Sequence, residues 1–327
     1  QDDALTQSAG AALREPQPLD GAREADEHVA AGLIQRLVEE SGARELLPVL
    51  AEPAALRVGH ASFGALWRAL LWWDGARPEA AAIGDAALPS AEVIRLTDTT
   101  AGGAPVVLAA KAGHNAVSHN HNDAGTFVLH VDGETLLCDP GSGKYSVRYF
   151  SEHRYENPFA NSYGHSVPRI GGALQSEGSD YRGVLRGHGA EEGAKWLEMD
   201  LQDAYAAPGL ERLRRVVRLA PQGEMALEDT YDVPGGALEV EEALVTYGEA
   251  TVEGRTARIQ GQRHALELEI EAPAAMTWSL EVLEEASRAN DKERPLRRLT
   301  FSFEAGPGEA VARVRGRIVP LCTTNRG

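Results

Sequence analysis

Cysteine, basic side chains and long apolar runs are all scarce in this chain. Its 327 residues include two cysteines, Cys138 and Cys322, which cannot form a disulfide framework for a chain of this length. Lys and Arg total 32 against 49 Asp and Glu, which gives a net charge of −17. We therefore expect neither nucleic acid nor a membrane as a partner, because nucleic acid and anionic membranes attract basic surfaces. No stretch of sequence approaches the roughly 20 apolar residues that a membrane-spanning helix requires.

The first part of the chain predicts a loose segment followed by helices. Residues 1–24 are rich in Ala, Gly, Pro, Asp and Gln without periodicity, which indicates a loose N-terminal segment. Residues 25–88 form a helical segment in this interpretation, because the apolar side chains within 25–41 and 63–73 fall at helical spacing. The chain starts at Gln1 rather than Met, which we interpret as a processed or truncated start.

From residue 89 onward the apolar pattern changes to the alternation of β-strands. Leu266, Leu268 and Ile270 alternate with glutamates, and the stretches 277–283, 299–304 and 310–319 show the same pattern. Turn sequences rich in Gly, Pro and Asp separate these runs. The sequence therefore predicts a mainly β fold, in which a large antiparallel β-sandwich over residues 89–327 follows a few α-helices.

The densest group of chemically active side chains lies between residues 113 and 175. If His119 and His121 begin the apolar strand that follows them, their spacing of two residues points both imidazoles to one face. An Asp-Gly turn then predicts a hairpin whose second strand ends at Asp139, beside the histidines. His165 is the candidate third imidazole, and imidazoles with a carboxylate suit a zinc ion.

Asp123, Cys138 and the remaining histidines of this region are not expected to bind the ion directly. Asp123 is close to the histidine pair and is a candidate to orient a histidine through its second ring nitrogen. Cys138 adjoins Asp139, so strand alternation turns its side chain away and we do not count it as a ligand. The competing hypothesis is that the histidines are merely polar groups at a strand end, and we prefer it for His114, His130 and His153.

Several basic residues gather close to this region in the sequence. They either form a local basic patch on an acidic body or are scattered, solvated side chains, and the sequence leaves both interpretations open. The residues are Lys144, Arg148, Arg154, Arg169 and Arg182.

Two strings carry a resemblance to a known family. The sequence HNHNDAGTFVLHVDGETLLCDPG, followed by NSYGHSVPRIGGALQ, resembles the heparinase II/III-like family of polysaccharide lyases over about residues 90–180. The resemblance implies an α/α toroid before an antiparallel β-sandwich, with an acidic polysaccharide bound between them, and a periplasmic or secreted protein. We expect residues 25–88 to be the end of that toroid and the chain to be part of a longer enzyme, because the residues before position 89 are too few for a complete one.

The resemblance also implies a role for each candidate residue. One structural zinc ion per chain would be held by His121, Asp139 and His165, and His119 would face the substrate and help catalysis. A tyrosine beyond Asp139 would complete the catalytic set, with Tyr155 favoured over Tyr145, and with Tyr149 a further competitor. We expect Arg148 and Arg154 to bind acidic groups of the glycan through paired hydrogen bonds.

The leading hypothesis for function is a lyase that cleaves uronic-acid-containing glycans, heparin-like or alginate-like, by β-elimination. Such an enzyme removes a proton beside the sugar carboxylate and expels the linked oxygen, so it needs a base, an acid and a stabiliser of negative charge. The alternatives are a zinc-stabilised carbohydrate-binding module without catalysis and a zinc hydrolase with an open coordination position.

Overall fold

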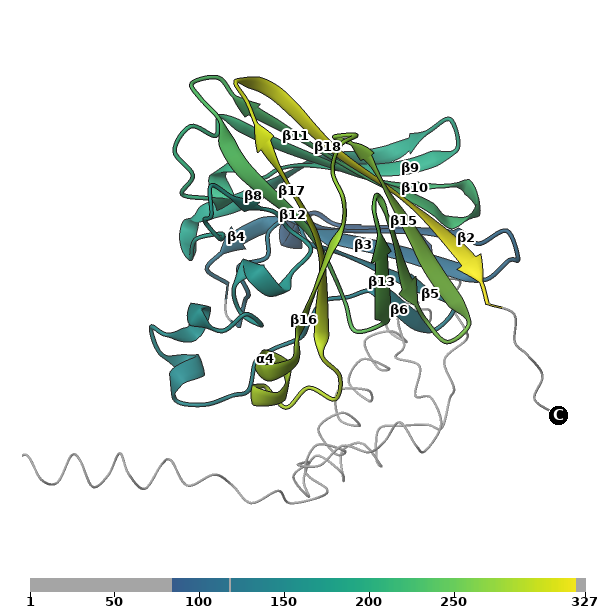
Figure 1. Ribbon diagram of the computed structural model, residues 1–327, viewed down its shortest axis with the longest axis horizontal. Coiled ribbons are helices and arrows are strands. Elements are labelled where there is room, and N and C mark those ends of the chain that lie inside the picture. Colours follow the sequence, from purple (N-terminus) through teal and green to yellow (C-terminus); the bar gives the residue numbers. More distant parts are fainter. Residues whose placement is uncertain (1–83, 118, 322–327) are drawn as a thin grey trace, which may run out of the picture. The chain divides into compact units, whose positions relative to one another are not determined.

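The computed structural model describes residues 84–117 and 119–321 and contains three antiparallel sheets in that part of the chain (Figure 1). The nine-stranded sheet consists, in spatial order, of β13 (Glu249–Glu253), β14 (Thr256–Gln260), β15 (His264–Ala272), β18 (Gly308–Pro320), β11 (Glu224–Val233), β10 (Arg212–Ala220), β9 (Ala194–Asp200), β8 (Gly178–Glu191) and β4 (Gly113–Asn115).

The five-stranded sheet runs in the order β1 (Ala86–Leu88), β2 (Val93–Thr99), β3 (Pro105–Lys111), β5 (Phe127–Val131) and β6 (Glu134–Leu137). The four-stranded sheet runs in the order β16 (Ser279–Leu283), β17 (Leu296–Ala305), β12 (Leu238–Thr246) and β7 (Arg169–Ile170). The helical elements are α4 (Glu284–Ala289) and the 3-10 turns η3 (Pro89–Ala91), η4 (Arg148–Phe150), η5 (Arg154–Glu156), η6 (Ser162–Gly164), η7 (Gln202–Ala204) and η8 (Pro221–Gly223).

The two smaller sheets pack against the nine-stranded sheet as a second layer. Strand β2 lies against β9 and β10, whereas β17 lies against β11 and β18. The smaller sheets meet where β6 approaches β12, at a hydrogen bond from Cys138 N to Val245 O of 3.1 Å. One hydrophobic core contains side chains from all three sheets. The predicted antiparallel β-sandwich is therefore confirmed.

The alternating pattern produces this core directly. On β15, Leu266, Leu268 and Ile270 are buried while Glu267 between them is exposed, as the sequence predicted. The β5–β6 hairpin is also confirmed, and its two turn residues, Asp132 and Gly133, adopt φ values of 48° and 84°. Both values lie in the left-handed region that two-residue hairpin turns require.

The predicted boundary between helices and sandwich is wrong by a few residues. Ala86–Leu88, assigned to the helical segment, is a strand that pairs with β2, because its backbone completes the edge of the five-stranded sheet. The expected loose segment and the two expected helices, within 25–41 and 63–73, lie outside the described residues. No helix among residues 84–117 and 119–321 is long and apolar enough to cross a membrane.

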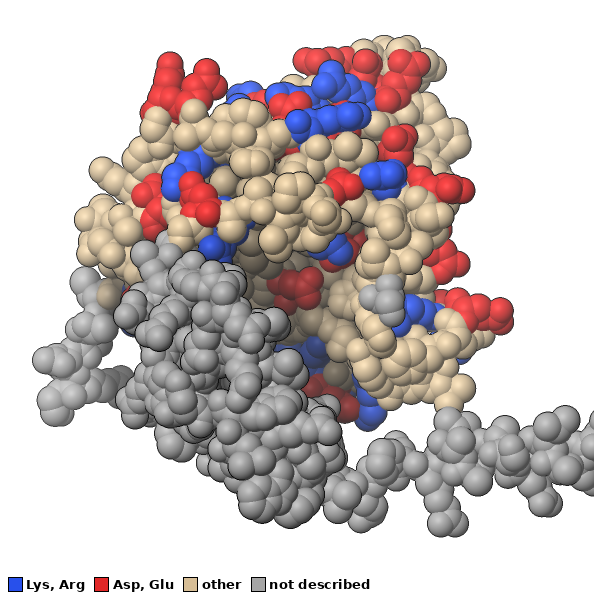
Figure 2. All heavy atoms as spheres, turned by 180° about the vertical axis from the view of Figure 1, so that it is seen from behind, with Lys and Arg blue, Asp and Glu red and all other residues tan. Residues whose placement is uncertain are grey.

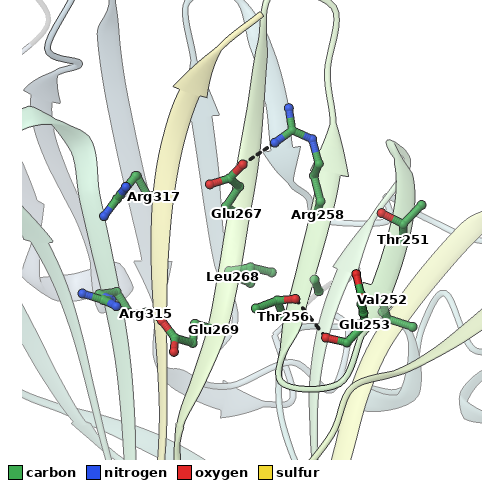
Figure 3. A pocket seen from close by; sticks show the side chains of 11 residues that line it. Thr251, Val252, Glu253, Thr256, Arg258, Glu267, Leu268, Glu269, Arg315 and Arg317 are labelled. Carbon is green, nitrogen blue, oxygen red and sulfur yellow. Dashed lines mark hydrogen bonds and ion pairs between the residues drawn. The ribbon is translucent and has the colours of Figure 1, made fainter.

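Charged side chains cover the sandwich in mixed signs. On the face shown in Figure 2, Lys and Arg side chains lie among Asp and Glu side chains. A hollow of about 530 Å³ on strands β13, β14, β15 and β18 has the same character (Figure 3). In it Arg258 pairs with Glu267, and Arg315 Nη2 lies 2.8 Å from Glu269 Oε2. Because these carboxylates already neutralise the arginines, the hollow offers no excess charge to a ligand.

Glu134 joins the β5–β6 hairpin to the nine-stranded sheet. Its carboxylate accepts hydrogen bonds from the backbone N–H groups of Gln262 at 2.5 Å, Arg263 at 3.1 Å and His264 at 2.7 Å. Burial alone would raise the pKa of Glu134, but these three donors hold it below its ordinary value. The carboxylate therefore stabilises the fold only while it is ionised.

We expect Glu134→Gln to lower the free energy of unfolding by about 2 kcal/mol at pH 7, the usual contribution of hydrogen bonds to a charged group. The folded pKa lies below the unfolded one, so this contribution is present above the unfolded pKa and is lost as the pH falls through the folded pKa. Urea unfolding of both proteins from pH 7 to pH 3 measures it. Glu267→Gln, which removes an exposed ion pair, is the matched control. A difference that stays constant with pH would contradict this account.

Candidate metal centre

Four side chains converge beside the start of β5 and the end of β6. One nitrogen or oxygen from each of His121, Asp123, Asp139 and His165 lies within 4.8 Å of the corresponding atoms of the others. His165 is fully buried, and neither of its ring nitrogens has a hydrogen-bond partner among the described residues. Leaving a buried polar group unsatisfied costs about 1–3 kcal/mol. A metal ion bound at Nδ1, the nitrogen that faces the two carboxylates, would remove that cost for this nitrogen, so the donor set could hold one.

The two carboxylates are oriented in the same way. Asp139 Oδ1 accepts a hydrogen bond from Gly141 N at 2.7 Å, and Asp123 Oδ1 receives one from Lys111 Nζ at 2.6 Å. Each Oδ2 is left facing His165 Nδ1, at 3.6 Å for Asp139 and 3.9 Å for Asp123. These separations exceed a hydrogen bond, but ligand atoms on one tetrahedral zinc ion stand roughly 3.4 Å apart.

The imidazoles are in the protonation state that a metal ion needs. Burial, together with the neighbouring His165, lowers the pKa of His121 to about 4. Burial also lowers the pKa of His165 itself. Both rings are therefore neutral near pH 7 and have a lone pair to offer. Cys138 is outside the cluster, as expected, because its side chain packs against Phe159. The same burial raises the pKa of its thiol to about 12.

The sequence suggested that His119 and His121 begin a strand, but the structure places both histidines in a loop. Strand β5 begins only at Phe127, since Gly125 has a φ of 91° and the Thr126 amide bonds back to Asp123 O at 3.0 Å. His119 has a left-handed φ of 60°. The two imidazoles consequently differ: His121 is half-buried in the cluster, whereas His119 is exposed with no hydrogen bond to a described residue.

Residues distant in sequence fix the loop that carries His121 and Asp123. The side-chain amide of Gln175 accepts from Ala124 N at 2.9 Å and donates to Ala124 O at 2.7 Å. The backbone of Asn122 is bonded to Ala160 O at 2.9 Å.

Val245 on β12 forms hydrogen bonds with the segments that carry Asp139 and His165. Its carbonyl accepts from the Cys138 amide, next to Asp139, and its amide donates to Ser166 Oγ at 3.2 Å, next to His165. The geometry of the cluster is thus set by the sandwich.

Asn120, between His119 and His121, accepts hydrogen bonds from two of the predicted functional residues, Arg154 and Tyr155. Its carbonyl oxygen accepts from Arg154 Nη2 at 2.8 Å, and its Oδ1 accepts from the Tyr155 hydroxyl at 3.0 Å. Burial raises the pKa of Tyr155, so this phenol keeps its proton at neutral pH. Sequence reasoning missed Asn120, although its place inside the HNHND string was the available signal.

Tyr149 is the tyrosine that touches the cluster. Its hydroxyl lies 3.4 Å from His121 Nε2 and accepts from Gly143 N at 3.2 Å, and its side chain is almost entirely buried. Tyr145 stacks on it with ring centroids 5.4 Å apart, and Tyr145 is 58% exposed. The guanidinium of Arg154 covers the Tyr149 ring at 4.5 Å. Spacing alone could not distinguish these tyrosines, because all of them follow Asp139 closely.

The predicted basic residues do not form an uncompensated patch. Arg148 pairs with Glu156, which also binds His153 Nδ1 at 2.6 Å, and these residues border a hollow of about 370 Å³ next to Tyr149. Three further pairs are Lys144 with Asp291, Arg169 with Glu241 and Arg182 with Glu92. Arg154 is instead held by Asn120 and the tyrosine rings.

Comparison with known proteins agrees with this fold. A family model described as heparinase II/III-like, C-terminal, matches residues 83–311. The chain belongs to this heparinase II/III-like family. No curated protein sequence matches it.

Solved heparinase structures resemble the chain in fold. A mutant of the heparan sulfate lyase HepC from Pedobacter heparinus has a TM-score of 0.64 and 14% identity over 90% of this chain. A structure described as heparinase III has a TM-score of 0.58 and 16% identity over 88% of this chain. In both comparisons this heparinase II/III-like chain covers only 42% of the other protein's chain.

Gly125 ends the loop of His121 and Asp123 in a conformation that only glycine adopts without strain. A Cβ atom there would stand 2.4 Å from Leu201 Cδ1, and the φ of 91° is unfavourable for any other residue. We expect Gly125→Ala to lower the free energy of unfolding by about 2–4 kcal/mol, from backbone strain and overpacking together.

Gly209→Ala is the control for Gly125→Ala. Gly209 has a similar φ of 94°, but a Cβ atom there meets nothing within 4 Å. This variant should lose only the strain contribution of about 1 kcal/mol. Equal losses for both variants in thermal and urea unfolding would show that contact with Leu201 is unimportant.

Proposed function

We propose that this chain forms the sandwich part of a polysaccharide lyase that cleaves uronic-acid-containing glycans by β-elimination, and that its four-residue cluster holds one structural zinc ion. The observation that carries the proposal is the buried, unbonded His165 beside two carboxylates and a neutral His121, with exposed His119 and half-buried Tyr155 on the same loop network. Family membership supports the reaction class.

Zinc is the ion that this donor set favours. Two neutral imidazoles and one or two carboxylates give the mixed nitrogen and oxygen set that zinc commonly binds. Asp139 and Asp123 present equivalent free oxygens, so Asp123 is a candidate fourth ligand in addition to the three residues assigned from the sequence. A bound zinc ion would cross-link loops far apart in sequence, which is a structural role.

In this proposal, separate residues around the cluster supply the base, the acid and the substrate contacts of an elimination reaction. His119 is exposed and suited to meet the uronate, either as the base or as a contact for its carboxylate. Tyr155 keeps its proton and is suited to donate it to the departing oxygen. Tyr145 is 58% exposed and offers ring surface on which a sugar can stack. The exposed Arg148 can bind a sulfate or carboxylate group in exchange for its present partner Glu156. In this proposal Tyr149 and Arg154 position these groups, because Tyr149 is buried and Arg154 is held by Asn120 and two tyrosine rings.

Zinc content is the first test. The purified chain should contain about one zinc per molecule by elemental analysis, and a His121→Ala, His165→Ala double variant should contain none. Chelation should lower the melting temperature of the parent chain together with its metal content, since structural zinc contributes directly to folding. A chain that loses activity on chelation with its fold intact would instead be a zinc hydrolase.

Elimination itself is tested on the protein in its natural full-length form, with heparin, heparan sulfate and alginate as substrates. The unsaturated sugar ends of the products absorb ultraviolet light, and Tyr155→Phe should reduce their rate of formation about 100-fold or more. Tyr181→Phe, on β8 and outside this group, should leave the rate unchanged. Glycan binding with no unsaturated product, and with only an affinity change in His119→Ala, would identify a carbohydrate-binding module.

A further inference from the structure

Arg215 is the largest fully buried side chain in the described part of the protein. It occupies an inward position of β10, in line with the buried Leu213, Val217 and Leu219. A charge in such a place is costly unless every part of it is paired. The partners of its guanidinium therefore indicate why the core contains it.

One side of the guanidinium is neutralised by a single carboxylate. Arg215 Nε lies 2.9 Å from Asp229 Oδ1 and Nη2 lies 2.5 Å from Asp229 Oδ2, and Asp229 is directly opposite on β11. Glu242 Oε2 stands 3.6 Å away, but burial and the Asp229 charge raise the pKa of Glu242 well above its ordinary value, which favours its neutral form. Arg215 and Asp229 thus form a neutral pair.

The remaining nitrogen of Arg215 reaches the candidate metal centre. Nη1 donates to Gly125 O at 2.9 Å and to Ser166 O at 2.6 Å. Gly125 follows Asp123 by two residues and Ser166 follows His165 directly. A single rigid, planar group therefore joins the backbones of the two loops that carry these donors. Lysine cannot reproduce this arrangement, because its ammonium is one point on a flexible stem.

We propose that Arg215 is a positioning residue for the metal centre, setting the separation of the Asp123 and His165 loops so that metal affinity depends on a side chain that contacts no ligand atom. This inference rests on the metal centre proposed above. A purely structural role would account for the pair with Asp229, which apolar residues of similar volume can often replace without loss of stability. It does not account for Nη1, which bonds only to carbonyls within two residues of donor residues.

The test compares metal affinity with stability in matched variants. The Arg215→Met, Asp229→Leu double variant removes both charges of the pair, which keeps the core free of an unpaired ion. Arg215→Lys retains the charge and loses the fork. Leu268→Ala is the control, because Leu268 is buried on β15, separated from β10 by β18 and β11, and its truncation destabilises the same core. Each purified protein is titrated with Co²⁺, whose visible spectrum reports ligand geometry, and then with Zn²⁺ in competition.

We expect both Arg215 variants to bind Co²⁺ at least about tenfold more weakly, the lower end of the effect of groups that orient metal ligands, with an altered spectrum. Leu268→Ala should keep the parent affinity and spectrum although its melting temperature falls. Parent affinity and spectrum in both Arg215 variants would overturn the inference while leaving the metal centre in place. Absence of Co²⁺ and Zn²⁺ binding by the unaltered chain would overturn the metal centre, and the inference with it.

Discussion

A neutral imidazole cut off from water needs a partner for its ring nitrogens, and this requirement organises the region around His165. The residue is fully buried, and carboxylate oxygens of Asp139 and Asp123 lie 3.6 and 3.9 Å from its Nδ1, beyond hydrogen-bonding distance. Protonating the ring would satisfy the carboxylates, but burial opposes the charge. A cation between the donors would balance the arrangement, and the surrounding loops, strands and hydrogen bonds hold the donors at that spacing.

The sequence predicted well those features that depend on local patterns. Alternation in Leu266, Leu268 and Ile270 predicted strand and burial together, because a two-residue period admits one inward face. The turn at Asp132-Gly133 predicted the hairpin, because left-handed backbone is accessible to these residue types. The convergence of His121, Asp139 and His165 was predicted from the hairpin, from the later histidine motif and from the family resemblance.

Features that depend on tertiary contacts were missed or misplaced. His119 and His121 were expected on one strand face, but the left-handed backbone at Gly125 and His119 ends that regularity before the strand begins. Tyr149 could not be separated from Tyr145 and Tyr155, since burial and the contact with His121 distinguish it and spacing does not. The alternating pattern of β10 places Arg215 at an inward position, so its burial could have been predicted. Its partners on β11 and in the loops depend on the fold and could not.

The order of residues along the chain has a consequence for biosynthesis. The four donors lie between His121 and His165, yet several groups that hold them come later: Arg215, Val245, and Lys292, whose Nζ bonds Pro140 O at 2.9 Å and Ser142 O at 2.7 Å. A chain emerging from the ribosome exposes its donors before their supports have been made. The proposed ion would therefore find its donors in their final geometry only after these later supports have been synthesised.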